Sequence, residues 1–299
     1  MKTAVFYYTQ SGQALCAAKS ICMPLERSGS VVVYKPIVPL QQYPFPWSRD
    51  EFFDTFPETR LGLPPSGIAP IDFTDVADAD LVMVVGQSWF LSPSLPLQSF
   101  FTDRQVIGYL KGRNVVFVNV CRNMWLMAIR KVKDYLHAAD AKLVGHIVLQ
   151  DYTPNLVSAL TIVRWLLHGR KQGTRFLPNA GVSDADIETA SRFGQIILSS
   201  WKNDAFGCMQ EQLLSAGAIR YKPSIMFMEK AGHRMFGLWA QFVRRKGGFR
   251  DERRRRRVRL FYYYLLFVLF GVSPFGQLFF YLTWPLQQVS RHRQEDCRC

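Results

Sequence analysis

The stretch Ala4-Val5-Phe6-Tyr7-Tyr8-Thr9-Gln10-Ser11-Gly12-Gln13 decides how the rest of this sequence is interpreted. Its first half is a short apolar run of the kind that forms a buried strand. The run stops at a loop of hydroxyl residues and glycine, and a helical pattern continues from Ala14 to about Met23. The loop N–H groups and the helix dipole then point at one spot, where Thr9 and Ser11 add hydroxyl donors. The stretch therefore predicts an anion site, with an unliganded strand–turn–helix unit as the alternative.

Charge is unevenly distributed along the 299 residues, which suffice for one large domain with appendages. Hydrophobic content of 48% and aromatic content of 14% exclude a disordered chain. Residues 244–299 carry 13 Lys and Arg against 4 Asp and Glu, which is +9 of the total +14. Because this charge lies beside an apolar segment, it favours a membrane surface and not nucleic acid as a partner.

The six cysteines, at positions 16, 22, 121, 208, 297 and 299, show no metal-ligand spacing with one another or with histidine. We therefore expect reduced thiols in a cytosolic chain and no metal site.

Short β-branched runs alternate with helical patterns along the first 200 residues. The expected strands are residues 3–8, 31–34, 81–85, 115–120 and 143–149, and the expected helices are 13–26, 94–102, 124–139 and 183–201. This alternation predicts an α/β fold with a doubly wound, five-stranded parallel sheet. Ligands bind at the carboxyl edge of such a sheet, where the loops after Tyr8, Val85, Val120 and Leu149 meet.

The chain divides into an α/β domain at 1–203, an extension at 204–250 and a basic, apolar tail at 251–299. Within the domain, residues 36–75 form an insertion rich in proline and aromatic residues. This insertion is either a lid over a substrate or an aromatic loop packed on the sheet edge. The mostly apolar helix expected at 156–167 either lines an acyl-chain groove, faces lipid, or is an ordinary core helix.

The tail begins with five consecutive arginines, from Arg253 to Arg257, and continues with an uncharged stretch at 260–286. That stretch exceeds the roughly 20 residues needed to cross a bilayer. A Gly-Val-Ser-Pro-Phe-Gly break in its middle leaves two alternatives, a kinked span or a shallow interfacial hairpin, and a pair of core helices is a third. Basic flanks place the α/β domain on the cytoplasmic face of the inner membrane, with Arg253–Arg257 and 260–289 contacting lipid.

The loop that follows the first strand resembles the FMN-phosphate loop of flavodoxin-like proteins. Thr9, Ser11 and Gly12 match that family's pattern, whereas Ala14 stands where its last threonine is expected. The resemblance implies a flavodoxin-like sheet that binds FMN through Thr9, Gln10, Ser11, Gly12 and Gln13.

The loop Gly86-Gln87-Ser88-Trp89-Phe90-Leu91-Ser92-Pro93 is loosely similar to a loop of flavodoxin-like quinone reductases. In those enzymes the aromatic pair packs beside the isoalloxazine ring and backbone N–H groups bind its polar edge. The similarity implies that Ser88, Trp89, Phe90 and Leu91 bind the cofactor, and the alternative is a pair of ordinary loop aromatics.

Two later loops supply further candidates. Cys121, Arg122 and Asn123 follow the fourth strand, where flavodoxin-like enzymes meet the flavin edge or the substrate, so the resemblance implies that Cys121 and Asn123 bind the cofactor. Arg122 would stabilise an enolate or a reduced flavin. Asn123 would cap the next helix, and Cys121 is a weak candidate nucleophile. Asp151 and Tyr152 follow the fifth strand and are candidate proton-transfer groups, although Asp151 is also a common turn residue.

Together these motifs, with Phe45-Pro46-Trp47 and Phe52-Phe53-Asp54-Thr55-Phe56-Pro57, resemble the bacterial dialkylresorcinol condensing enzyme family of flexirubin and aryl-polyene pigment pathways. The resemblance covers roughly residues 3–230. It implies a hydrophobic substrate, and the pathway ketosynthase and a second copy of the chain as partners. We expect a membrane-associated FMN-dependent oxidoreductase that converts a dialkylcyclohexanedione to a resorcinol. The alternatives are a condensing transferase that uses Cys121 and a non-catalytic scaffold.

Overall fold

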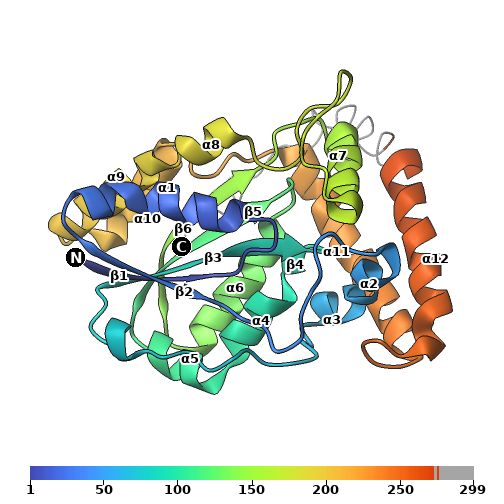
Figure 1. Ribbon diagram of the computed structural model, residues 1–299, viewed down its shortest axis with the longest axis horizontal. Coiled ribbons are helices and arrows are strands. Elements are labelled where there is room, and N and C mark those ends of the chain that lie inside the picture. Colours follow the sequence, from blue (N-terminus) through green and yellow to red (C-terminus); the bar gives the residue numbers. More distant parts are fainter. Residues whose placement is uncertain (273–274, 276–299) are drawn as a thin grey trace.

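The computed structural model describes residues 1–272 and Phe275, and its centre is a parallel sheet in the order β2-β1-β3-β5-β6 (Figure 1). The strands are β1 (Lys2–Tyr7), β2 (Val31–Pro36), β3 (Leu81–Trp89), β4 (Ser92–Pro93), β5 (Asn114–Cys121) and β6 (Lys142–Gln150). The two-residue β4 pairs only with the end of β3. Without β4 the order is that of a flavodoxin-like doubly wound sheet, so the predicted α/β fold class is confirmed.

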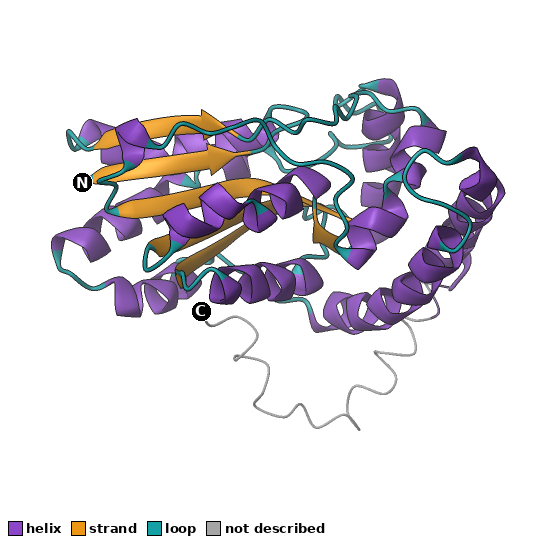
Figure 2. Ribbon diagram, turned by 90° about the horizontal axis from the view of Figure 1, so that it is seen from below, coloured by secondary structure: helices purple, strands orange, loops and turns teal. Residues whose placement is uncertain are grey.

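Both faces of the sheet are buried, which explains why its strands are nearly continuous apolar runs. Val5, Met83 and Val116 belong to the core cluster on one face. Phe6 and Phe117, which are offset by one residue, belong to the cluster on the other. This period of two follows from the strand pleat. Helices cover both faces of the sheet (Figure 2).

The helices segregate by face (Figure 1). One face carries α1 (Gln13–Arg27), α8 (Asp184–Glu188), α9 (Ser191–Lys202) and α10 (Phe206–Ser215), and the other carries α4 (Leu95–Thr102), α5 (Arg104–Leu110) and α6 (Leu126–Ala138). The helix expected at 183–201 is therefore two helices.

Met209 and Leu213 of α10 enter the sheet's core, and the Val148 N–H donates to the Ala218 carbonyl at 2.8 Å. Residues as far as Ala218, which the expected division assigns to the extension, therefore pack against the sheet.

The insertion at 36–75 holds two short helices, α2 (Arg49–Asp54) and α3 (Phe56–Leu61), followed by the 3₁₀ turn η1 (Thr74–Val76). Ser48 is the N-cap of α2, because its hydroxyl accepts the Glu51 N–H at 3.2 Å and donates to the Glu51 carboxylate at 2.6 Å. Tyr43 and Trp47 are buried against Trp89 with edge-on rings. These two residues are thus packed on the sheet edge, as one of the two interpretations of the insertion expects.

A helical hairpin lies beyond the sheet. It consists of α11 (Pro223–Arg244), the 3₁₀ turn η2 (Glu252–Arg254), and α12 (Arg255–Leu266), which continues as the π-helical turn η3 (Phe267–Val272). The arginine run is not uniformly solvated, because Arg254 is fully buried. Its guanidinium pairs with Asp54 at 2.7 Å and with both oxygens of Glu58 at 2.7 and 2.9 Å. The hairpin is therefore pinned to the insertion by a buried ion-pair triad.

Within residues 1–272, no helix has both the length and the apolar character that a bilayer crossing requires. The expected span at 260–286 is described only as far as Val272 and at Phe275. The second apolar run at 278–286, Cys297 and Cys299 lie outside the described residues.

The buried triad yields a stability prediction. Arg254→Ala leaves the partly buried Asp54 without its cation and leaves the buried Glu58 with only the exposed Arg244, 3.5 Å away, so the free energy of unfolding should fall by about 3–5 kcal/mol. Urea unfolding followed by circular dichroism measures this loss. The control is Arg256→Ala, which alters an exposed member of the same run and should change stability by no more than about 0.5 kcal/mol. Equal effects of the two substitutions would contradict the pinning role of Arg254.

Candidate functional site

A cavity of about 240 Å³ opens at the carboxyl edge of the sheet. Its floor comes from the loops that follow β1, β3 and β5. Its walls come from Phe45 and Phe52 of the insertion and from α7 (Asn155–His168), the helix expected at 156–167. β1 and β3 lie side by side here, at the point where the strand order reverses. Doubly wound sheets bind their ligands at this switch point.

The loop after β1 has the features of an anion site. Gly12 is the N-cap of the 15-residue helix α1, with a left-handed φ of 88° and no other atom within 4 Å of the position a Cβ would take. The first N–H groups of a helix have no intrahelical partner. The Thr9 hydroxyl is buried and has no hydrogen-bond partner in the described part of the chain, and Ser11 lines the cavity. An anion at this loop would satisfy these donors.

The two glutamines of the loop have structural contacts. Gln10 Nε2 donates to the Pro44 carbonyl at 3.0 Å, and Gln13 Nε2 donates to the Val182 carbonyl at 2.7 Å. These bonds tie the insertion and the 181–182 segment to the loop. Cofactor binding by Gln10 and Gln13 therefore stays a prediction that concerns their backbone N–H groups, since both side-chain amides are engaged.

The strand β3 runs four residues past its expected end, because β4 pairs with Ser88 and Trp89. The intervening Phe90 and Leu91 both have left-handed φ values, 46° and 62°, which a tight two-residue turn requires. This conformation costs about 1–2 kcal/mol per residue without glycine. Packing offsets the cost, since the Phe90 ring lies 4.7 Å from that of Phe52 and 5.3 Å from that of Phe56. Strained backbone of this kind is concentrated at ligand sites.

Trp89 and Ser88 both line the cavity but also have protein partners. The Trp89 indole is buried edge-on against Tyr43 and Trp47. The Ser88 hydroxyl donates to Asn119 Oδ1 at 2.9 Å, and the buried Asn119 Nδ2 has no partner among the described residues. This unsatisfied donor lies beneath Ser88 and is not itself part of the cavity lining.

Arg122 carries the only charge among the described residues that line this cavity. Its Nη1 donates to the Asn155 carbonyl at 3.0 Å and to Asn155 Oδ1 at 3.1 Å. Burial lowers the pKa of Arg122 to about 10, and the nearby Asp151 opposes that shift. The guanidinium therefore remains positive at neutral pH and gives the cavity an electropositive end.

The expectation that Asn123 caps the next helix is wrong. Asn123 Nδ2 donates instead to Asn155 Oδ1 at 2.9 Å. The N-cap residue of α6 is Trp125, and its side chain makes no capping hydrogen bond. A residue from another helix serves this end: Glu229 of α11 is fully buried and accepts the Met127 N–H at 2.8 Å. Sequence reasoning missed Glu229 because the contact spans about 100 residues.

Cys121 lies buried at the end of β5 and lines the cavity. Burial raises the pKa of its thiol far above the usual value, and the Glu229 charge raises it further. The thiolate, which is the nucleophilic form, is therefore disfavoured at this position.

Asp151 and Tyr152 line a neighbouring cavity of about 210 Å³, on the far side of the 181–182 segment. The Asp151 carboxylate accepts the Thr153 N–H at 2.9 Å and the Ser158 hydroxyl at 2.6 Å. The Tyr152 ring lies under Arg220, 4.7 Å away. The structure thus brings Arg122 to the main cavity and places these two predicted partners in the second one.

Several wall residues were not singled out from the sequence. They are Gln87, Ile162, Trp165, Leu166, Gly181 and Val182. In α7, Trp165 is buried, whereas Leu160 and Val163 are 49% and 44% exposed. The helix is therefore both a cavity wall and a partly exposed apolar surface, which combines two of its three interpretations.

The chain resembles known proteins in structure only. No family model and no curated protein matches the chain. Among solved structures, the chain is similar to a flavodoxin from the domain Archaea, with 14% identity over 68% of this chain and 99% of that one and a TM-score of 0.40. It is also similar to a Lactobacillus acidophilus flavoprotein in complex with FMN, with 17% identity, coverage of 50% and 93%, and a TM-score of 0.36. The strand order β2-β1-β3-β5-β6 establishes the fold.

The buried Glu229 yields a pH prediction. Burial raises its pKa to about 7, above the unfolded value of about 4.3. Between these values the native state holds a proton that the unfolded state has released, so this group makes the free energy of unfolding fall as pH rises. Glu229→Gln should remove that fall. Between pH 4.5 and 8, the free energy of unfolding of the variant should therefore rise by about 2–3 kcal/mol relative to that of the unsubstituted chain.

Urea unfolding at a series of pH values measures the effect. Glu211→Gln, which alters an exposed glutamate of α10, is the control and should follow the unsubstituted chain. Parallel stability curves for Glu229→Gln and the unsubstituted chain would contradict the prediction.

Proposed function

We propose that this protein is a flavin-dependent redox enzyme that binds FMN at the carboxyl edge of its sheet. The observation that carries the proposal is the anion loop at residues 9–13, which starts α1 beside the switch point and leaves the Thr9 hydroxyl without a partner. A phosphate at that loop would place the rest of the cofactor in the adjoining cavity.

The donor set fits FMN in chemistry. Hydroxyls and helix N–H groups suit the phosphate, aromatic walls suit a flat ring, and Arg122 suits its electron-rich edge. The cavity of about 240 Å³ is slightly smaller than the roughly 300–1,000 Å³ typical of small-molecule sites. The walls formed by Phe45, Phe52 and Trp165 would therefore move outward to admit the ring.

A bound flavin supplies a hydride acceptor. The chain contributes the remaining requirements: Arg122 stabilises negative charge that develops on a substrate oxygen, and the aromatic walls exclude water. We further propose that the substrate is a hydrophobic dialkylcyclohexanedione, which would give one hydride to a bound flavin and its acidic proton to solvent to become a resorcinol. The apolar walls and the single cation support this choice. Its place in aryl-polyene lipid synthesis, the ketosynthase partner and the inner-membrane location extend the proposal from the sequence resemblance.

Two alternative functions receive less support. A condensing transferase would need Cys121 as a thiolate, which its burial disfavours. A non-catalytic scaffold would have no use for the unsatisfied Thr9 hydroxyl or for a strained turn at Phe90 and Leu91. The geometry therefore favours the redox enzyme.

The first test alters the anion loop. The double substitution Thr9→Val with Ser11→Ala removes two hydroxyl donors to a charged group and should weaken FMN binding at least tenfold. Quenching of FMN fluorescence on titration with the full chain measures the affinity. Ser215→Ala, at an exposed serine ending α10, is the matched control. If the double variant has a native circular dichroism spectrum and an unchanged FMN affinity, the loop at residues 9–13 does not bind the FMN phosphate.

The second test separates binding from chemistry. Arg122→Gln should leave FMN affinity within about threefold, because the phosphate loop is intact, and should slow anaerobic flavin bleaching by a 2,5-dialkylcyclohexane-1,3-dione about 100-fold. Stopped-flow absorbance measures the bleaching rate. Lys202→Gln, at an exposed cation of α9, serves as the control. If Arg122→Gln and Lys202→Gln bleach equally fast, Arg122 has no part in the reaction.

A further inference from the structure

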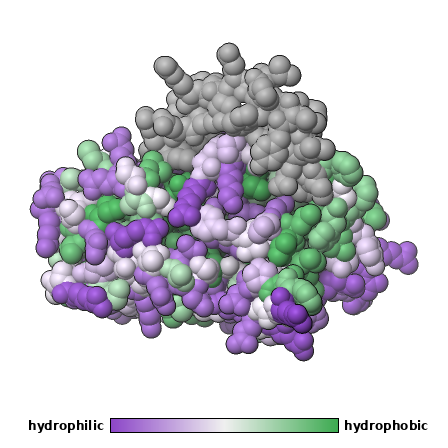
Figure 3. Space-filling model, turned by 90° about the horizontal axis from the view of Figure 1, so that it is seen from above, coloured by the Kyte–Doolittle hydropathy of each residue, from purple (hydrophilic) through white to green (hydrophobic). Residues whose placement is uncertain are grey.

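The outer face of α12 changes from cationic to apolar along its length. Arg256, Leu260, Tyr263 and Phe267 follow one another at spacings of four, three and four residues, so they share one side of the helix. Leu260, Tyr263 and Phe267 are 51%, 60% and 67% exposed. Apolar side chains gather at this end of the molecule in the space-filling view (Figure 3).

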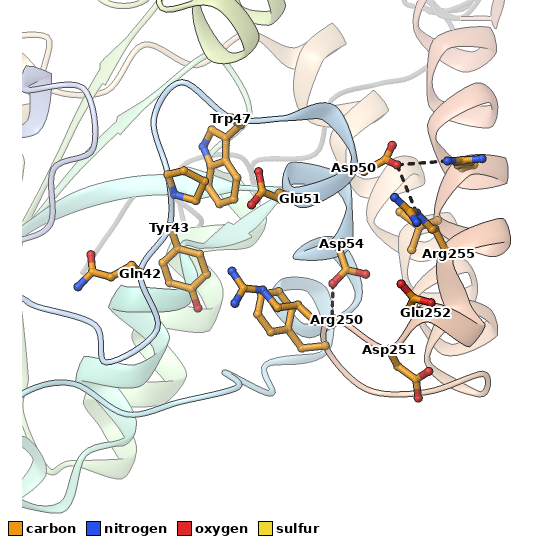
Figure 4. A pocket seen from close by; sticks show the side chains of 14 residues that line it. Gln42, Tyr43, Trp47, Asp50, Glu51, Asp54, Arg250, Asp251, Glu252 and Arg255 are labelled. Atoms are coloured by element: carbon orange, nitrogen blue, oxygen red, sulfur yellow. Dashed lines mark hydrogen bonds and ion pairs between the residues drawn. The ribbon is translucent and has the colours of Figure 1, made fainter.

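The arginines of the run point in different directions. Arg254 is buried in its triad, and Arg255 and Arg259 face Asp50 at 3.6 and 3.5 Å (Figure 4). Of the remaining members, Arg253 pairs with Asp251, and Arg257 donates to the Phe242 carbonyl of α11 and lies 4.0 Å from the centroid of the Phe242 ring. Asp50 is shared by Arg255, Arg259 and Arg49, so it offsets their charge only in part, whereas Arg256 is exposed and has no ion-pair partner among the described residues.

Positive charge lines a cleft at the closed end of the hairpin. The cleft is lined by Arg245, Lys246, Arg253, Arg256 and Arg257, with Glu252 as its one carboxylate. Arg253 is paired with Asp251 at 2.6 Å. In the described part of the chain, Lys246 and Arg256 have no ion-pair partner. A cleft with this composition fits phosphate groups of an anionic surface.

The inner side of α12 is fixed to the rest of the protein. The Phe261 ring stacks on that of Phe56 with centroids 3.6 Å apart, and the Tyr264 ring lies 4.8 Å from that of Trp239 on α11. Together with the Arg254 triad, these contacts hold the outer face in one orientation. The exposed apolar side chains of α12 therefore have a fixed orientation relative to the rest of the protein.

We propose that this outer face docks on an anionic phospholipid bilayer and enters only one leaflet. The path from Arg256 to Phe267 is about 16 Å long at 1.5 Å per residue, and one hydrocarbon leaflet is about 15 Å deep. A tilted α12 therefore holds its cations at the lipid phosphates while its aromatic end lies in the acyl chains. The charge pattern commits the face to lipid, because a protein partner would not require cations at one end and uninterrupted apolar groups at the other.

Vesicle flotation of the full chain tests the proposal. The probes are vesicles of 70% phosphatidylcholine with 30% phosphatidylglycerol, and vesicles of phosphatidylcholine alone. The double variant Arg253→Gln with Arg256→Gln should bind the anionic vesicles at least tenfold more weakly, at roughly fivefold per cation lost. The double variant Leu260→Ser with Phe267→Ser should lose at least tenfold on the same vesicles.

The matched controls lie on the opposite end of the sheet. Lys19→Gln with Lys202→Gln removes two exposed cations, and Val31→Ser removes an apolar side chain that is 55% exposed; both should bind within twofold of the unsubstituted chain. Anionic binding unchanged in both α12 variants would overturn the proposal and assign any affinity to another part of the chain. Equal binding to neutral and anionic vesicles, or no binding to either, would also overturn it.

Discussion

The parallel pairing of β1 and β3 is the constraint on which the rest of the structure depends. Parallel strands need crossover connections, and right-handed crossovers place all the loops that follow the strands at one edge. Since β2 lies beyond β1 and β5 lies beyond β3, the connections diverge at this pair. The anion loop, the strained turn and the Arg122 loop consequently meet around one cavity, although they are spread over more than 110 residues.

The insertion links that cavity to the helical hairpin. Phe52 lines the cavity on one side and contacts Phe90, while Phe90 contacts Phe56, which stacks on Phe261 of α12. Asp54 and Glu58, from the same segment, hold Arg254. The hairpin is therefore no independent appendage. Its position and the cavity wall are set by one continuous aromatic and ionic contact network, which suggests why a turn as unfavourable as Phe90-Leu91 is tolerated.

Local patterns predicted the sheet well and the site only in part. Each strand was located to within a few residues because both faces are buried and its apolar run is uninterrupted. The anion loop was evident because its chemistry is contained in five consecutive residues. Burial of Arg254 was not predictable, because five identical neighbours look alike until the carboxylates of the insertion select one of them. The cap that Glu229 gives to α6 and the separation of Asp151 from the main cavity likewise depend on contacts between segments distant in sequence.

The visible absorption spectrum of the purified full chain, before and after heat release of any chromophore, tests the central claim most directly. The account predicts the visible absorption bands of an oxidised flavin and released FMN close to one per chain. If the protein instead lacks bound FMN, it should take up added FMN to the same ratio. A colourless protein that also fails to bind added FMN would contradict the account, because the anion loop would then serve no flavin.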